Sequence, residues 1–211
     1  MKTIGIFGNS GFAREVNDIA NDLGFNSIFV IREEKELESY QSEKEIILEK
    51  KITGYRHIPF IIGVGENKVR EKIWNKFKND LNFINLIHPS ATFGKGQKEL
   101  IDLKLGVIVC AGVRFTNNIE VGNFTIFNLN CTIGHDSIIE DFSNIAPGAN
   151  ISGNVHISKR CWIGTGAKIN QGNPQKKLLI DDDTTIGSGS VVIKDCDKNS
   201  VYVGVPAKRI V

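Results

Sequence analysis

The stretch VGNFTIFNLNCTIGHDSIIEDFSNIAPGANISGNVHI, Val121 to Ile157, carries a large apolar residue at every sixth position. The same phase continues on both sides of this stretch and comprises Leu103, Val109, Phe115, Val121, Phe127, Ile133, Ile139, Ile145, Ile151, Ile157, Ile163 and Ile169. In a chain with 41% hydrophobic residues, chance would give such a run with a probability on the order of 10⁻⁵. The period of six is therefore a property of the fold.

A period of six fits neither an α-helix nor an array of hairpins, but it fits a chain that turns a corner every six residues. One bulky side chain per segment would point inward, and three segments would close a triangular coil of about 18 residues. Smaller or slimmer residues stand four positions after the large ones, where such a prism narrows: Val107, Val113, Ile119, Thr125, Cys131, Ser137, Ser143, Ala149, Val155, Cys161 and Ala167. The sequence therefore predicts a left-handed parallel β-helix, an exception to the usual right-handed crossover.

One insertion interrupts this period after Ile169. The polar stretch NQGNPQKKLLIDDD, residues 170–183, precedes Ile186 and Val192, at which the pattern resumes. Long insertions in a solenoid lie on its surface, often near the binding face, but a surface loop of this length is also tolerated without any role. We therefore expect either a contact with a ligand or a neighbouring subunit, or a tolerated loop.

The first part of the chain, about 85 residues, follows a different pattern. Short apolar runs typical of buried strands cover Thr3–Gly8, Ser27–Ile31 and Phe60–Gly65. Helical spacing covers Ala13–Gly24 and the charged segment Glu66–Asn79. Strands that alternate with helices in this order predict a small parallel sheet of the α/β class.

Composition excludes several classes of protein. The formal net charge of +2 over 211 residues gives no basic field of the kind that nucleic-acid binding requires. The sequence contains no run of about 18 apolar residues, so we expect no membrane span. The first residues lack the apolar block of a signal peptide. The cysteines show no CxxC pairing and lie mostly within the apolar repeat, as small core residues do. We expect a reduced, cytoplasmic protein.

Three further motifs accompany the repeat: GIFGNSGFAREV near the start, LIHPSA (Leu86–Ala91) between the two patterns, and VYVGVPAKRIV at the end. Together with the repeat they resemble the PglD/NeuD-type sugar acetyltransferases over essentially the whole chain. The resemblance implies a Rossmann-like sugar-nucleotide-binding domain over residues 1–86 and a β-helix that binds acetyl-CoA and carries the catalytic residues over residues 87–211. It also implies a homotrimer with active sites between subunits.

The activity that this resemblance implies is acetyl transfer from acetyl-CoA to the 4-amino group of a nucleotide-linked 4-amino-4,6-dideoxyhexose. The insertion NQGNPQKK resembles that of members acting on dTDP-sugars, so dTDP is favoured over UDP. The product would enter a surface glycan such as O-antigen. Two alternatives stay open: O-acetylation of sialic acid, and a catalytically silent β-helix that binds a sugar nucleotide or a partner protein.

A base for such a reaction is available in His135, because an unperturbed histidine titrates near neutral pH. His135 stands two positions after the inward-facing Ile133, so its side chain should project outward from the coil. The alternative is an ordinary exposed histidine. The resemblance places the catalytic base at His135 and an acid that supports it at Asp136.

The remaining histidines do not predict a metal site. His88 precedes a proline at the junction of the two halves, where we expect a structural role, and His156 should lie on another face of the coil from His135. A zinc site needs convergent ligands, and the four histidines of the chain are scattered. We therefore expect no metal.

Acetyl-CoA would be bound by residues of the β-helix. Gly153 lies one coil after His135, and the resemblance implies that its N–H binds the thioester carbonyl; the alternative is a corner glycine chosen for backbone freedom. Asn144 stands where relatives can carry a second histidine at the CoA site. The resemblance further implies contacts from Thr165, Gly187 and Ser188, while Lys208 and Arg209 could either meet the CoA phosphates or form a solvated tail.

The sugar nucleotide would be bound in the first half. GNSG, residues 8–11, follows the first strand and precedes a helix, so its amides can approach a phosphate or a ring. This loop lacks the full GxGxxG of a dinucleotide site. By resemblance the contacts come from Asn9, Ser10 and Gly11, from Arg32 and Glu33 after the second strand, and from Gly65 at the edge of the third.

Overall fold

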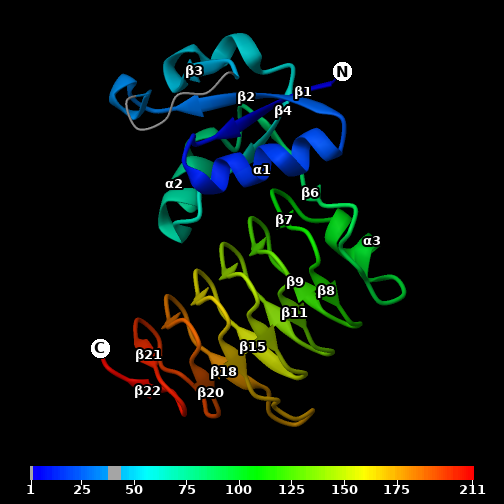
Figure 1. Ribbon diagram of the computed structural model, residues 1–211, viewed down its shortest axis with the longest axis vertical. Coiled ribbons are helices and arrows are strands. Elements are labelled where there is room, and N and C mark those ends of the chain that lie inside the picture. Colours follow the sequence, from blue (N-terminus) through cyan, green and yellow to red (C-terminus); the bar gives the residue numbers. More distant parts are fainter. Residues whose placement is uncertain (1, 38–43) are drawn as a thin grey trace.

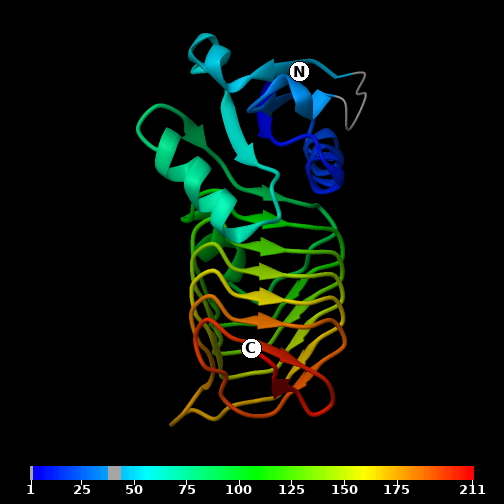
Figure 2. The same cartoon turned by 90° about the vertical axis from the view of Figure 1, so that its left-hand side faces the viewer.

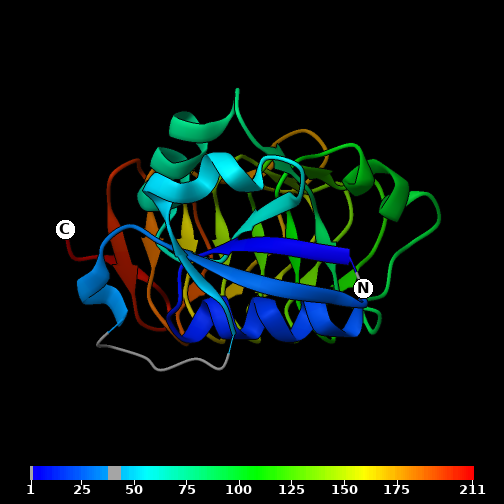
Figure 3. The same ribbon diagram turned by 90° about the horizontal axis from the view of Figure 1, so that it is seen from above.

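The computed structural model describes residues 2–37 and 44–211. Its N-terminal part is a five-stranded parallel sheet in the order β3-β2-β1-β4-β5, between helices α1 and α2 (Figures 1 and 3). The elements are β1 (Lys2–Phe7), α1 (Gly11–Asp22), β2 (Phe25–Ile31), β3 (Ile46–Leu48), β4 (Pro59–Ile62), α2 (Asn67–Phe77) and β5 (Asn82–Phe83). Two short 3-10 helices, Glu34–Leu37 and Glu49–Tyr55, complete it. This strand order is that of one Rossmann half with its flanking strands.

The strands and helices predicted in this half are all present, but the sequence missed two strands. β3 and β5 are only three and two residues long, too short to show a periodic pattern. Since β4 ends at Ile62, the predicted third strand is also shorter than expected. Within the described residues, no helix is long and apolar enough to cross a membrane.

The C-terminal part is the predicted left-handed parallel β-helix, with three walls of parallel strands stacked coil upon coil (Figure 2). Wall 1 contains β6 (Leu86–Ile87), β7 (Ile108–Val109), β10 (Ile126–Phe127), β13 (Asn144–Ile145), β16 (Trp162–Ile163), β19 (Thr185–Ile186), β21 (Val201–Val203) and the antiparallel β22 (Lys208–Arg209). Wall 2 contains β8 (Arg114–Phe115), β11 (Thr132–Ile133), β14 (Asn150–Ile151), β17 (Lys168–Ile169) and β20 (Val191–Val192). Wall 3 contains β9 (Glu120–Val121), β12 (Ile138–Ile139), β15 (Val155–Ile157) and β18 (Leu178–Ile180).

The inward-facing series is confirmed except at its first member. From Val109 to Ile169, every large residue of the series is buried, as are the slim residues between them and the later Ile186 and Val192. The prediction that Leu103 faces inward is wrong, because this residue is 79% exposed. The chain there leaves helix α3 (Gln97–Asp102), and the regular coil begins only afterwards.

Each corner of the prism holds residues with a left-handed backbone, stacked one coil apart. At the 2–3 corner, which joins walls 2 and 3, these are Asn118, Asp136 and Asn154, with φ of 56°, 60° and 57°. At the 3–1 corner they are Phe124, Phe142, Arg160 and Asp183. The insertion leaves the coil at the 2–3 corner, between β17 and β18. Only its first part is a loop, because Leu178–Ile180 forms a strand of wall 3.

The N-terminal part packs on the first coils and along the 3–1 corner. Phe124 and Phe142 stack in parallel at 5.4 Å, and Trp74 of α2 lies 4.6 Å from the Phe124 ring. On the other face of the sheet, Ile6 and the helix residue Val16 share one apolar core with the coil residues. The two parts are therefore joined by continuous apolar packing.

Arg70 of α2 fastens this contact. Its side chain is fully buried and donates to the carbonyl oxygens of Phe124 at 2.8 Å and Phe142 at 2.6 Å. It also donates to Val64 at 3.0 Å and Gly65 at 2.9 Å, in the loop after β4. Burial lowers the pKa of the Arg70 guanidinium to about 9. One cation thus ties the loop after β4 to the corner of the β-helix.

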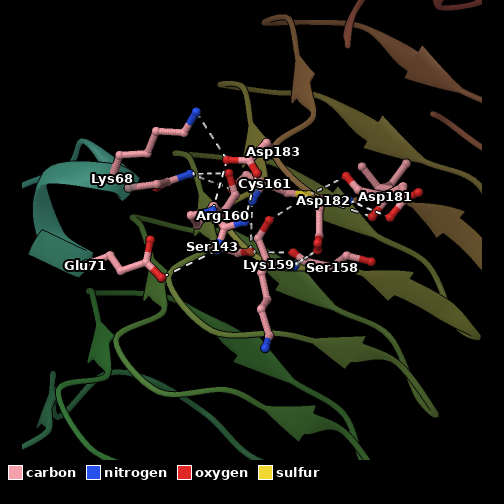
Figure 4. A network of polar contacts seen from close by, with 12 residues as sticks. Lys68, Glu71, Ser143, Ser158, Lys159, Arg160, Cys161, Asp181, Asp182 and Asp183 are labelled. Carbon is pink, nitrogen blue, oxygen red and sulfur yellow. Dashed lines mark hydrogen bonds and ion pairs between the residues drawn. The ribbon is translucent and has the colours of Figure 1, made fainter. Parts of the chain in front are cut away.

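A polar network continues this contact along the corner (Figure 4). Asn67 donates its amide to the carbonyl oxygens of Arg160 at 2.8 Å and Cys161 at 3.1 Å. Arg160 forms a two-bond ion pair with Asp183, at 3.0 and 2.8 Å, and lies 3.5 Å from Glu71 of α2. The helix is therefore held at both its first and its second turn.

Candidate functional site

His135 and Asp136 form a hydrogen-bonded pair at the open 2–3 corner. The Nδ1 atom of His135 lies 2.7 Å from Oδ2 of Asp136, and the His135 side chain is 47% exposed. Because ionised Asp136 can only accept, the pairing places the proton of neutral His135 on Nδ1. Nε2 then carries the free lone pair, as a general base requires.

Asp136 is held on several sides. Asn118, one coil earlier, donates its amide to Oδ1 of Asp136 at 2.5 Å, and Lys177 of the insertion donates to the Asp136 carbonyl oxygen. The hydrogen bond from Asn118, followed by that from His135, lowers the pKa of the Asp136 carboxyl. The carboxylate is therefore ionised and fixed in place.

Gly153 lies directly against the His135 ring. A Cβ atom at this position would stand 2.5 Å from Nε2 and 2.6 Å from Cε1 of His135, so a larger residue would displace the ring. The left-handed conformation at this turn belongs to Asn154, not to Gly153. The close approach of the imidazole, rather than a left-handed backbone, is therefore what favours glycine here. In the described residues the Gly153 N–H has no hydrogen-bond partner.

A polar cavity of about 260 Å³ adjoins this pair. Its walls come from the 2–3 corner and from the insertion: Asn118, Glu120, Asp136, Ser137, Asn154, Pro174 and Lys177. The insertion is tied down by backbone bonds from Gly172 to the Gly153 carbonyl oxygen at 3.1 Å and from Leu178 to that of Asn154 at 3.0 Å. The loop therefore packs on the histidine corner of its own chain.

A second cavity of about 530 Å³ lies at the carboxyl ends of β1, β2 and β4, where open α/β sheets bind ligands. Three of the predicted nucleotide contacts line it: Asn9, Ser10 and Arg32. Gly11, Glu33 and Gly65 are not among its lining residues. Lys72 and Lys76 of α2, which were not predicted from the sequence, also line it, together with Glu36 and Glu49; Lys76 forms an ion pair with Glu49.

The predicted CoA residues fall in three places. Thr165, Gly187 and Ser188 lie together at the 1–2 corner, where Gly189 donates to the Thr165 carbonyl oxygen at 2.8 Å. Asn144 is buried in wall 1, with 2% of its surface exposed, while Gly153 belongs to the histidine corner. The structure thus separates Asn144 and the 1–2 corner from His135 within one chain. The exposed Lys208 and Arg209 form β22.

A third cavity, about 420 Å³, lies between α2 and wall 1 and was missed from the sequence. It is lined by Glu66, Asn67, Lys68, Arg160, Trp162, Asp183 and Thr185. The one available signal was Trp162, an aromatic residue at an outward position of the repeat. The partners on α2 could not be identified, because their contact with the corner depends on how the two parts pack.

The other histidines of interest have structural partners. Nε2 of His88 lies 2.9 Å from Asp22, as its predicted structural role requires. Nε2 of His156 lies 2.7 Å from Glu140 on wall 3. In the part of the chain that the structure describes, no cluster of three or more His, Cys, Asp or Glu residues could hold a metal ion.

Comparisons with known proteins agree with this architecture. Residues 3–77 match the family described as "PglD N-terminal domain". The GDP-perosamine N-acetyltransferase of Escherichia coli O157:H7 is 25% identical over 199 residues, which cover 85% of this chain and 83% of that protein. The structure of WeeI from Acinetobacter baumannii AYE superposes with a TM-score of 0.87 at 26% identity, over the full length of both chains.

A third similar protein shares the fold at lower identity. PerB from Caulobacter crescentus, solved in complex with CoA and GDP-perosamine, has a TM-score of 0.85 and 22% identity, over 99% of this chain and 97% of that chain. The N-terminal match, the fold shared over the whole chain and the motifs that join the two halves all point to one group. The chain thus has a PglD-type N-terminal domain and is similar over its whole length to sugar acetyltransferases of the PglD/NeuD type.

Proposed function

We propose that this protein transfers an acetyl group from acetyl-CoA to the 4-amino group of a nucleotide-linked 4-amino-4,6-dideoxyhexose. The observation that carries the proposal is the geometry of His135, whose Nδ1 is held by Asp136 at 2.7 Å and whose Nε2 faces Gly153. A relative that aligns over 83% of its length is named GDP-perosamine N-acetyltransferase.

The chemistry follows from these groups. The amine attacks the thioester carbonyl carbon to form the new C–N bond, and neutral His135 takes the amine proton at Nε2. The tetrahedral intermediate then collapses with cleavage of the C–S bond, and the CoA sulfur leaves as a thiol with the proton returned by the His135 imidazolium. Asp136 accepts the Nδ1 hydrogen bond, fixes the tautomer and stabilises the imidazolium. The unpartnered N–H of Gly153 is suited to donate to the carbonyl oxygen as negative charge develops on it. The reaction needs no serine or cysteine nucleophile.

In this proposal residues 1–86 bind the sugar nucleotide and residues 87–211 bind acetyl-CoA. The cavity lined by Asn9, Ser10 and Arg32 takes the nucleotide, and Thr165, Gly187 and Ser188 line a path for pantetheine. His135 lies on a different corner from the one on which the N-terminal part packs. A homotrimer with active sites between subunits would bring the cavity of one copy to the histidine of another.

The finer assignments belong to the same proposal. We keep dTDP as the favoured nucleotide, and add GDP to the candidates because of the E. coli relative. Gly11, Glu33 and Gly65 remain proposed contacts for the nucleotide or sugar, and Asn144 for CoA. The product would enter a surface glycan, made by a cytoplasmic enzyme.

The base is tested with His135→Ala, assayed with acetyl-CoA and amino-sugar nucleotides. We expect kcat to fall by about 10²-fold or more. His156→Ala is the matched control, since it removes another imidazole that is paired with a carboxylate, and should retain nearly full kcat. A His135→Ala enzyme with near wild-type kcat would overturn the assignment.

The acceptor is identified with a panel of dTDP-, UDP- and GDP-linked 4-amino sugars, together with free and CMP-linked sialic acid. The mass gain of one acetyl group marks the substrate. Acetylation of sialic acid alone would establish O-acetylation instead. If acetyl-CoA well above about 0.1 mM gave no thermal stabilisation, a silent binding protein would be the better explanation.

A further inference from the structure

The carboxylate of Asp136 is held by a different donor at each oxygen. Oδ2 lies 2.7 Å from Nδ1 of His135, and Oδ1 accepts the side-chain amide of Asn118 at 2.5 Å. Asn118 stands 17 positions before His135. No motif marks it in the sequence, so it was not predicted as a site residue. Its amide nevertheless completes a chain of contacts that ends at the imidazole.

The coil geometry puts Asn118 within reach of Asp136. The two residues are 18 positions apart, stacked on the same corner, with left-handed φ of 56° and 60°. The Asp136 N–H also bonds the Asn117 carbonyl oxygen at 3.3 Å. Adjacent coils of a parallel sheet lie about 4.8 Å apart, a spacing that one short amide side chain bridges. Asparagine is one of the few residues that both tolerates this backbone and donates a hydrogen bond.

The charges around the pair are few. Lys177 lies nearby and donates to the Asp136 carbonyl oxygen, and its charge favours the ionised carboxyl. Glu120 lines the same cavity. Lys177 contacts the backbone of Asp136, so Asn118 and His135 are the side chains that hold the carboxylate itself. The orientation of that carboxylate therefore depends on the amide.

We propose that Asn118 is a positioning residue, which fixes the Asp136 carboxylate and through it the orientation and tautomer of the His135 ring. The inference rests on the proposed role of His135 as the base. Without the amide, the carboxylate can rotate away from Nδ1 and becomes hydrated. The Nδ1 hydrogen bond is then weakened, and the tautomer that leaves the lone pair on Nε2 is no longer enforced.

The test uses Asn118→Gly in the full-length protein, because glycine keeps the left-handed backbone and removes only the amide. Asn199→Gly is the matched control, an exposed asparagine with a φ of 53° far along the chain. We expect kcat/KM of Asn118→Gly to fall about 10-fold. Asp136→Asn should lower kcat/KM in the same direction, and Asn199→Gly should leave it unchanged.

A second measurement separates this inference from the proposed function. NMR of the His135 ring nitrogens reports its tautomer without turnover, and should show less of the Nδ1–H form in Asn118→Gly. If His135→Ala stays active while this tautomer changes, the role of the base is wrong but Asn118 still positions the pair. An unchanged kcat/KM and an unchanged tautomer in Asn118→Gly, beside an inactive His135→Ala, would overturn the role of Asn118.

Discussion

The 2–3 and 3–1 corners of the β-helix share one backbone and differ in use. Both stack residues with a left-handed backbone on successive coils, so the two corners share this main-chain conformation. At the 2–3 corner Asn118 and Asp136 face solvent and hold His135. At the 3–1 corner Phe124 and Phe142 are buried beneath α2. A repeat of this kind fixes positions, and the side chains placed at them decide whether a corner does chemistry or joins domains.

The difference also sets how much each corner contributes to stability. The 3–1 corner combines stacked rings with Arg70, whose hydrogen bonds to buried carbonyl oxygens lie in a low-dielectric environment where such bonds are strong. The His135–Asp136 pair is about half exposed, and an exposed polar pair of this kind contributes little to stability. We therefore expect changes at the 3–1 corner to unfold the protein, and changes at the 2–3 corner to lower activity.

The largest effect is expected from Arg70→Met. The substitution leaves the carbonyl oxygens of Val64, Gly65, Phe124 and Phe142 without their buried donor, which should cost about 3–5 kcal/mol of unfolding free energy. Urea denaturation measures the loss. Arg114→Met is the control, an exposed arginine on wall 2, expected to change stability by less than about 0.5 kcal/mol. Equal midpoints for the two variants would contradict the role of Arg70.

Arg70 also shows where sequence reasoning stopped. Its segment has the charged, amphipathic pattern of a surface helix, and its burial arises only when α2 packs on the corner. His135 and Gly153 could be paired in advance, since a period of 18 stacks them. Asn118 obeys the same period but carried no distinguishing motif. Leu103 fits the six-residue spacing but is exposed, because it precedes the first regular coil of the β-helix.

Gly153→Ala separates activity from stability at the 2–3 corner. The added Cβ would meet the His135 ring at 2.5 Å, and the half-exposed ring can swing aside, which breaks its contact with Asp136. We expect kcat to fall about 10²-fold, with unfolding free energy changed by less than about 1 kcal/mol. Steady-state kinetics and urea denaturation on the same preparation give both values.

Gly148→Ala is the control for this variant. Gly148 has a φ of 66° and open space around its Cα, so alanine should cost about 1–2 kcal/mol through backbone strain and leave kcat unchanged. Gly153→Ala should therefore lower kcat more than stability, and Gly148→Ala should lower stability but not kcat. Equal loss of kcat in both would mean that general disturbance of the coil, and not the His135 ring, explains the result.

The smallest effect is expected at the rim of the 3–1 corner, from Asp183→Asn. The hydrogen bond from Arg160 lowers the pKa of Asp183 below the 3.8 that is usual for an aspartate, so the pair stabilises the fold above that pH. This contribution, about 1 kcal/mol, is lost as the pH falls below 3.8 toward the lowered folded-state pKa. The variant should therefore be less stable at neutral pH and lose less stability on acidification.

Urea denaturation between neutral and acidic pH measures this slope, with Asp197→Asn as its control. Asp197 also faces an arginine, at 3.4 Å, but its side chain is 72% exposed, so solvent screens the pair. If both variants altered the acid dependence of the unfolding free energy equally, the burial of Arg160 and Asp183 by α2 would not contribute to stability. A selective effect at Asp183 would show that packing of α2, rather than the ion pair alone, makes this corner the more stable of the two.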